Sequence, residues 1–240
     1  MSKIILRYFP VLGRVQALRH ALSDAGLDYE DLQIPLDDQW LNHKQDPSIA
    51  GPFGGLPTLS WNGEFVSETL PIANFLSKRL GHDEGLSDVQ IAYHQSLVSN
   101  CYVEGIMRLG EIVWSDLIYS GLDISASLPM LLGRVVDKMA RLSAIAPSAG
   151  FWGDSHAKRP VMADFFAAET LYALRYVLGP KRDSALRSKM PRLFEIQEAL
   201  EQRPSLAPAF GARPAQFTGH PMEASAIEKL RALNLSSIEL

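Results

Sequence analysis

The sequence is poor in cysteine, in clustered basic residues and in long apolar runs. Cys101 is the only cysteine among 240 residues, so no disulfide can form within the chain and a Cys-rich metal site is excluded. Lys and Arg are dispersed and the net charge is −4, which argues against nucleic acid or an anionic membrane as partner. No run approaches the roughly 20 apolar residues that span a bilayer, and Met1–Arg14 lacks the layout of a signal peptide. These absences predict a cytoplasmic protein.

Metal and phosphate chemistry also lack their usual signals. The six histidines fall in no metal-ligand spacing, and no phosphate-binding glycine loop is present, so we expect no metal. Cys101 lies among apolar residues of a helical pattern. We interpret it as a buried, unreactive side chain rather than as a nucleophile.

The first 80 residues mix strands and helices. Four short apolar runs predict strands: Lys3–Phe9, Tyr29–Ile34, Leu56–Trp61 and Glu64–Ser67. Asn62–Gly63 joins the last two and predicts a hairpin, because both residues tolerate positive φ. A helix is expected after Gly13 with Gly26 as its stop, and another over Thr69–Leu80, where Thr69 is able to cap the first turn.

From residue 88 onward the pattern is helical throughout. Helical periodicity covers four segments: Asp88–Gly110, Ser125–Ala146, Val161–Leu178 and Leu193–Gln202. A proline-punctuated tail closes with the amphipathic piece Glu223–Leu233. The predicted fold class is therefore α/β plus all-α: a small mixed domain over 1–80, a polar linker over 81–87, and an all-helical domain with a tail over 88–240.

Five stretches in this order resemble cytosolic glutathione transferases over nearly the whole chain up to Phe210. They are Leu6-Arg7-Tyr8-Phe9 with the following residues through Arg14, Gly55-Leu56-Pro57-Thr58-Leu59, Ser67-Glu68-Thr69-Leu70-Pro71-Ile72, Met162-Ala163-Asp164-Phe165, and Glu201-Gln202-Arg203-Pro204. The resemblance is closest to the tyrosine-dependent, sigma- or mu-like classes. It implies a thioredoxin-like N-terminal domain followed by a helical bundle domain. It also implies glutathione as co-substrate and a homodimer.

Within this resemblance Tyr8 is the expected catalytic residue, with Arg14 in support. The first strand is not followed by a Cys-x-x-Cys pair, so the thiol has to arrive with a ligand. Lowering a thiol pKa of about 8.5 by about two units takes roughly 2.7 kcal/mol, and one hydrogen bond to a charged group contributes about 1.5–3 kcal/mol. One phenol hydroxyl therefore suffices for most of the shift. The alternatives are a half-buried strand tyrosine for Tyr8 and a structural ion pair for Arg14.

The resemblance also places the glutathione-binding residues. Leu56 and Pro57 match a cis-proline turn that presents the backbone of Leu56 to the cysteinyl part, the alternative being an ordinary trans proline. Glu68 and Thr69 begin a helix whose free N–H groups suit the γ-glutamyl carboxylate, with Glu68 facing the ammonium; simple helix capping is the alternative.

Trp40 and Lys44, four residues apart, match a pair that holds the glycyl carboxylate, and alone they would be a surface contact. Asp164 matches a structural capping motif, although Val161 stands where relatives carry Ser or Thr and cannot cap. Some classes reach the γ-glutamyl amine with an acid of the partner subunit. The corresponding stretch Leu97-Val98-Ser99-Asn100 carries none, so Glu68 acts alone or Ser99 or Asn100 substitutes weakly.

The expected activity is conjugation of the glutathione thiolate to an electrophilic, mostly apolar small molecule. The pocket for this molecule is expected where the two domains meet, lined by Phe9, Leu12, Tyr102, Ile106 and the tail near Phe210–Phe217, although these apolar side chains suit the core equally well. The alternatives are a glutathione-dependent isomerase or ether-cleaving enzyme, and a catalytically silent structural protein of the same fold. A glutaredoxin-like reductase is disfavoured, because no cysteine lies near the N-terminus.

Overall fold

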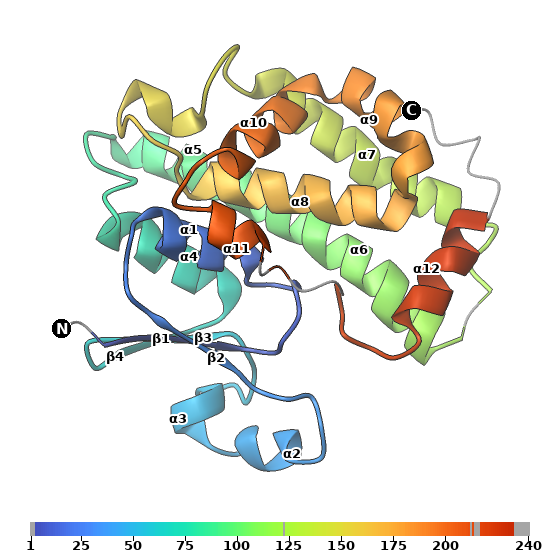
Figure 1. Cartoon of the computed structure of the whole chain (residues 1–240), viewed down its shortest axis with the longest axis horizontal. Helices are drawn as coiled ribbons and strands as arrows, with labels where there is room; N and C mark the ends of the chain where they lie inside the picture. The colour runs from blue at the N-terminus through green and yellow to red at the C-terminus, as the bar shows by residue number, and fades with distance from the viewer. Residues whose placement is uncertain (1–2, 122, 212, 214–216, 233–240) are drawn as a thin grey trace.

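The chain begins with a four-stranded mixed sheet. The computed structural model describes residues 3–121, 123–211, 213 and 217–232. The strands are β1 (Ile4–Tyr8), β2 (Glu30–Gln33), β3 (Thr58–Trp61) and β4 (Glu64–Ser67), in the order β2-β1-β3-β4. β1 pairs with β2 in parallel and with β3 in antiparallel, and β3 and β4 form a hairpin (Figure 1). The predicted hairpin is confirmed, since Asn62 and Gly63 both have positive φ, 52° and 91°.

Helices cover the sheet. α1 (Gln16–Asp24) and α4 (Thr69–Arg79) lie between the sheet and the rest of the molecule, and the short α2 (Trp40–His43) and α3 (Pro47–Ala50) project on the other side (Figure 1). α1 stops where predicted, because Gly26 has a φ of 65° that a residue with a Cβ rarely adopts.

Every element after Arg79 is helical among the residues described. The helices are α5 (Asp88–Ser99), α6 (Arg108–Gly110), α7 (Leu128–Ile145), α8 (Met162–Leu178), α9 (Asp183–Lys189), α10 (Pro191–Glu201), α11 (Ala207–Gly211) and α12 (Glu223–Ala232), with short 3₁₀ turns η3 (Trp152–Ser155) and η4 (Pro180–Arg182). Leu233, the expected end of the last amphipathic piece, lies outside the described residues. The division into 1–80, a linker over 81–87, and 88–240 stays a prediction.

The first long helix differs most from its prediction. Instead of ending at Gly110 it continues to Tyr119, because α5 and α6 are joined and extended by the π-helical stretches η1 (Asn100–Met107) and η2 (Glu111–Tyr119). The predicted helix already contains η1, and the part that the prediction missed is η2. In both stretches the hydrogen bonds run from i to i+5.

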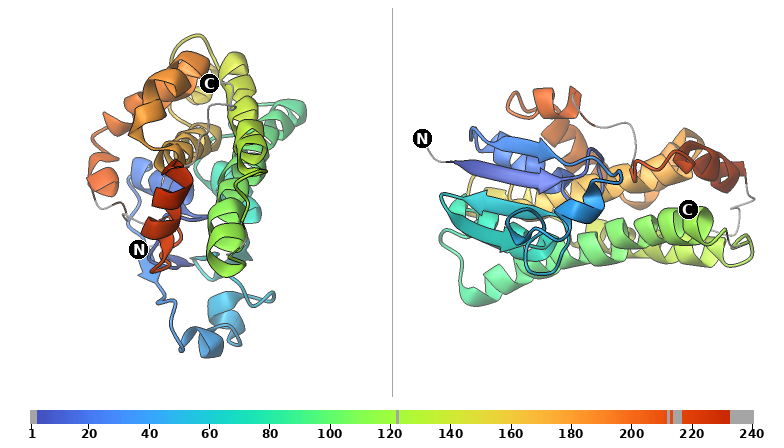
Figure 2. Two further views of the ribbon diagram at one scale, coloured as in Figure 1. Left: turned by 90° about the vertical axis from the view of Figure 1, so that its right-hand side faces the viewer. Right: turned by 90° about the horizontal axis from the view of Figure 1, so that it is seen from below.

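α8 forms the centre of the helical part, where its phenylalanines Phe165 and Phe166 are fully buried. One continuous apolar cluster includes residues of both the sheet and the helices, and α1 packs directly against α8. At Gly105 a Cβ would lie 2.2 Å from Cγ2 of Thr170, so glycine permits the close approach of η1 to α8. Figure 2 shows α12 against the far end of the long helix, in agreement with its contacts to η2. Among the described residues, no helix is long and apolar enough to cross a membrane.

Candidate active site

A cavity of about 410 Å³ lies between the end of β1, the α2 region and the long helix. Its walls come from three parts of the chain that are far apart in sequence. They are the first half (Tyr8, Phe9, Val11, Gly13, Arg14, Leu36, Trp40, Lys44, Gly54, Gly55 and Leu56), the long helix (Ile106, Met107, Gly110, Glu111, Trp114 and Ser115), and the C-terminal segment (Phe217 and Thr218). All three parts, the first half, the long helix and the tail, are those expected from the sequence to meet at the second-substrate pocket.

Tyr8, the last residue of β1, points its hydroxyl into this cavity. Its Oη accepts a hydrogen bond from the backbone N–H of Arg14 at 3.2 Å, so the phenol proton remains available to a ligand. Burial raises the pKa of Tyr8, partly countered by the charge of Arg14, so the hydroxyl stays protonated at neutral pH. A Cβ at Gly13, whose φ is 41°, would lie 2.6 Å from Oη of Tyr8. Glycine at this position therefore makes room for the hydroxyl.

Two cations face the cavity, Arg14 and Lys44. Neither side chain has a carboxylate partner among the residues described, so the structural ion pair considered for Arg14 is not found there. Trp40 begins α2, and the backbone N–H of Lys44 donates to its carbonyl at 2.8 Å, which brings both residues onto one turn as predicted. Trp40 is held by an edge-on contact with Phe9, with ring centroids 5.0 Å apart. The cavity is therefore suited to an anionic ligand.

The turn before β3 supplies backbone groups. The Leu56–Pro57 peptide bond is cis, as predicted. Leu56 lines the cavity, and among the described residues its N–H and C=O take part in none of the backbone hydrogen bonds. They are free to pair with an extended ligand in the manner of a short strand.

Glu68 and Thr69 lie at the edge of the cavity rather than among its lining residues. Glu68 holds a φ of 73°, unusual for a residue with a side chain, and its carboxylate oxygen lies 3.9 Å from the Cβ position of Gly55 in the cavity wall. Thr69 does not cap α4, contrary to the prediction: the N-cap residue is Glu68 and no side chain caps the helix. Instead, Oγ1 of Thr69 is buried without a hydrogen-bond partner among the described residues. A buried hydroxyl left unpaired is costly, which favours a ligand as its partner.

Phe9 and Ile106 line the cavity as expected, but Leu12 and Tyr102 do not. Leu12 is 2% exposed and Tyr102 is 8% exposed; both belong to the core, where the ring of Tyr102 packs edge-on against Phe166 at 6.2 Å. The long helix contributes instead the pairs Ile106–Met107, Gly110–Glu111 and Trp114–Ser115, spaced by four residues. Residues four apart lie on one face of a helix, and Trp114 follows the predicted Ile106 by two such steps. Tyr102 belongs to the same series but packs against α8, so periodicity alone does not separate the lining residues from the core.

The tail contributes Phe217, but Phe210 turns away. The ring of Phe210 packs against His20, with centroids 4.4 Å apart. Residues 214–216, inside the tail stretch named by the sequence analysis, lie outside the described residues.

Two further residues singled out in the sequence, Asp164 and Cys101, are buried away from the cavity. Asp164 is fully buried and accepts hydrogen bonds from the N–H groups of Val161 at 2.9 Å and Trp152 at 3.0 Å, so it secures the start of α8 although Val161 has no capping side chain. Cys101 is fully buried, and burial raises the pKa of its thiol to about 12, in keeping with an unreactive side chain. No three His, Cys, Asp or Glu side chains gather as metal ligands within the described part of the chain.

The fold defines a class. A small sheet domain followed by a helical part is the arrangement found in solved glutathione S-transferases; one example is the monomeric Na-GST-3 of the hookworm Necator americanus, which is 21% identical with a TM-score of 0.68 and covers 89% of this chain and 98% of that one. No family model matches the chain.

In sequence, the chain is 28% identical over 219 residues to hematopoietic prostaglandin D synthase of Gallus gallus, covering 89% of this chain and 98% of that protein. It is 38% identical over 74 residues to probable glutathione S-transferase 7 of Caenorhabditis elegans, covering 31% of this chain and 34% of that one. The chain is therefore similar in fold to solved glutathione S-transferases and in sequence to proteins of that kind, and the comparisons do not distinguish a class among them.

Proposed function

We propose that the protein is a glutathione S-transferase in which Tyr8 stabilises the thiolate of bound glutathione for attack on an electrophilic, largely apolar small molecule. The observation that carries the proposal is the Tyr8 hydroxyl. Its oxygen accepts the N–H of Arg14, so its proton is available to a ligand in a cavity that also holds two cations with no carboxylate partner among the residues described.

Polar groups around the cavity that have no partner among the described residues suit the separate polar parts of glutathione. Glutathione carries two carboxylates, one ammonium and one thiol. Lys44 with the indole of Trp40 suits the glycyl carboxylate, and the buried hydroxyl of Thr69 suits the γ-glutamyl carboxylate. Glu68, whose carboxylate has no partner among the described residues, suits the ammonium, and the free backbone groups of Leu56 suit the cysteinyl part.

Tyr8 and Arg14 would both stabilise the thiolate form of bound glutathione over its thiol form. A hydrogen bond from Tyr8 to a charged sulfur contributes about 1.5–3 kcal/mol, and each pKa unit corresponds to about 1.4 kcal/mol. The guanidinium of Arg14 adds positive potential to the same cavity. Positioning and electrostatic stabilisation carry the rate, and no covalent bond to the protein is required.

The second candidate function is that of an isomerase, in which the same glutathione thiolate takes part in the reaction and is regenerated at its end. This isomerase candidate is favoured by the similarity in sequence to an enzyme named prostaglandin D synthase, which extends over 98% of that protein. The two are separated by whether glutathione is consumed in proportion to product.

The decisive experiment is an ultraviolet titration of glutathione bound to wild-type protein and to Tyr8→Phe. We expect a thiol pKa about two units below the free value of about 8.5 in the wild type, and a return to within about half a unit of that value in Tyr8→Phe. Tyr29→Phe is the matched control, because Tyr29 is another partly buried tyrosine of the first half that does not line the cavity. A bound thiol with an ordinary pKa in the wild type, or no bound glutathione, would overturn the proposal in favour of a silent structural protein.

A further inference from the structure

The C-terminal segment 217–223 is organised around one buried carboxylate. Glu223, the first residue of α12, has no exposed surface. Its Oε1 accepts the N–H of Phe217 at 2.7 Å and the hydroxyl of Tyr176 at 2.6 Å. Its Oε2 accepts the N–H of Thr218 at 2.6 Å, the N–H of Gly219 at 3.0 Å, and the Thr218 hydroxyl. Five donors on one carboxylate make a charge-assisted cluster that holds the turn at 217–219 against α8.

This turn reaches the cavity at the loop beside Tyr8. The carbonyl of Phe217 accepts the N–H of Gly13 at 3.1 Å, and Gly13 is the residue that makes room for the Tyr8 hydroxyl. On its other side the Phe217 ring lies 3.7 Å from the Cβ position of Gly110, where the long helix carries no side chain. Phe217 therefore spans the space between the Tyr8 loop and the long helix.

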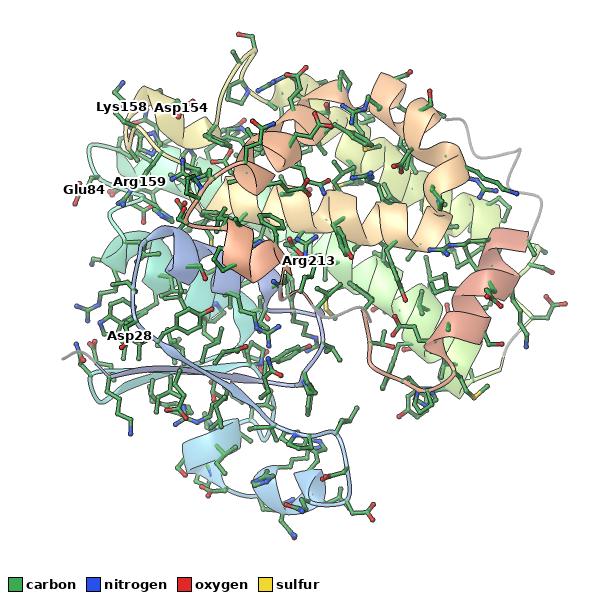
Figure 3. All side chains as sticks on the ribbon, in the orientation of Figure 1. Asp28, Glu84, Asp154, Lys158, Arg159 and Arg213 are labelled. Carbon is green, nitrogen blue, oxygen red and sulfur yellow. The ribbon has the colours of Figure 1, made fainter. Side chains whose placement is uncertain are left out.

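The same segment also orients a second aromatic wall. The ring of His220 meets Trp114 edge-on with centroids 5.4 Å apart, and Trp114 lines the cavity. Upstream lies Arg213, which Figure 3 labels. It pairs with the buried Glu169 of α8, and its guanidinium lies 3.8 Å from the centroid of the Tyr172 ring. Contacts on both sides of Phe217 thus tie the C-terminal segment to α8 and to the long helix.

We infer that Glu223 is a positioning residue for the second substrate: through the turn at 217–219 it holds the ring of Phe217 as a wall of the half of the cavity that takes the electrophile, and this half accepts an aromatic group. The inference rests on the proposed function, because it assigns the other half of the cavity to glutathione. The aromatic class follows from the wall itself, because Phe217 and Trp114 both line the cavity beside the long helix.

The test compares two probes by calorimetry, glutathione and S-benzylglutathione, which differ only by an aromatic group on the sulfur. In Phe217→Ala we expect the Kd of S-benzylglutathione to rise by about 3- to 10-fold, as for loss of an aromatic contact, and the Kd of glutathione to stay within about twofold. Glu223→Gln is expected to do the same, because an amide has one acceptor oxygen and leaves at least two of the five donors unpaired.

A double variant separates positioning from general stability. If Glu223 acts through Phe217, the variant carrying both changes loses no more S-benzylglutathione affinity than Phe217→Ala alone. Glu228→Gln is the matched control, since Glu228 is an exposed acid on the same helix and its variant should bind both probes as the wild type does. Should Glu223→Gln fail to fold, Tyr176→Phe removes one donor of the cluster without changing a cavity-lining residue, and it is expected to weaken S-benzylglutathione binding in the same direction.

The outcomes are distinguishable. A wild type that binds neither probe overturns the proposed function and this inference together. A wild type that binds both, with a folded Phe217→Ala that binds S-benzylglutathione equally well, overturns this inference and leaves the proposed function standing. Losses that add fully in the double variant overturn the role assigned to Glu223.

Discussion

The position of the Tyr8 hydroxyl depends on a neighbouring glycine, which has no side chain. Gly13 lies directly beneath it, and the next residue donates the N–H that occupies the phenol oxygen. Both contacts come from the short loop between β1 and α1. The direction of one hydrogen bond to the thiol is therefore set by the backbone of this loop rather than by the tyrosine alone.

Gly13→Ala is expected to raise the pKa of the bound thiol by about one unit, because the new Cβ would meet Oη of Tyr8 and push it from its position. The measurement is the ultraviolet titration of bound glutathione. Gly26→Ala is the matched control: its φ of 65° imposes a similar backbone cost of about 1 kcal/mol, but nothing lies within 4 Å of its Cβ position. An equal thiol pKa in the two variants would contradict this role of Gly13.

Thr69→Val is expected to change stability and binding in opposite directions. Removing a buried hydroxyl that has no partner among the described residues should stabilise the unliganded protein by about 1 kcal/mol. Loss of a hydrogen bond to a carboxylate should weaken glutathione binding about 10-fold or more. Urea unfolding and calorimetry measure the two effects. If the variant and the wild type bind glutathione with equal Kd, Thr69 does not bind glutathione.

At the scale of elements, α8 and the turn before it depend on one buried acid. Asp164 joins the backbone of Val161 to that of Trp152 and has no contact with solvent. Burial raises the pKa of its carboxyl to about 7, from about 3.9 in an unfolded chain. The folded protein therefore keeps a proton that the unfolded chain has released. This favours folding below about pH 4, and the contribution is lost as the pH rises through about 7.

Asp164→Asn should lower the free energy of unfolding by about 1–3 kcal/mol, because an amide cannot accept from both N–H groups with two equivalent oxygens. The advantage of the wild type over the variant should be larger at pH 5 than at pH 8, by on the order of 2 kcal/mol. Urea unfolding at both pH values measures it. Asp88→Asn, which changes an exposed acid in the first turn of α5, is the control and should show no such difference. A pH-independent difference would contradict the raised pKa.

At the scale of the whole molecule, several large apolar side chains remain exposed. Phe53 is 73% exposed, and Val89 and Tyr93, one turn apart on α5, are 79% and 45% exposed. Exposed apolar side chains of this kind favour an interface with another protein surface, and a two-fold dimer uses the same surface twice. We propose a homodimer on these grounds; Na-GST-3, a structure of the same fold, is described as monomeric.

Sedimentation equilibrium is expected to show a dimer for the wild type and a shift toward monomer, by about 10-fold or more in Kd, for Phe53→Ser. Ile145→Ser is the matched control, because Ile145 is 56% exposed at the end of α7. Equal dimerisation of the two variants would show that Phe53 lies outside any interface. A monomeric wild type would contradict the proposed homodimer.

The sequence by itself determined the features that depend on neighbouring residues. Strand alternation, helical periodicity, and the tolerance of Asn62–Gly63 for positive φ are local properties, so most elements fell within a few residues of their predicted bounds. Tyr8, at the end of the first predicted strand, and Leu56–Pro57, at the start of the third, were identified through the resemblance to glutathione transferases. The cis bond and the placement of Tyr8 in the cavity agree with this.

Only the tertiary structure decided which side chains share the cavity. Tyr102 and Trp114 lie on the same long helix at the same four-residue spacing, but Trp114 lines the cavity while Tyr102 packs against α8. Thr69 resembles a helix cap in sequence, yet its hydroxyl is buried and has no partner in the part of the chain that the structure describes. Phe217 reaches the Tyr8 loop through Gly13, about 200 residues earlier in the chain. Such contacts depend on how distant segments pack, and no local pattern of residues records that packing.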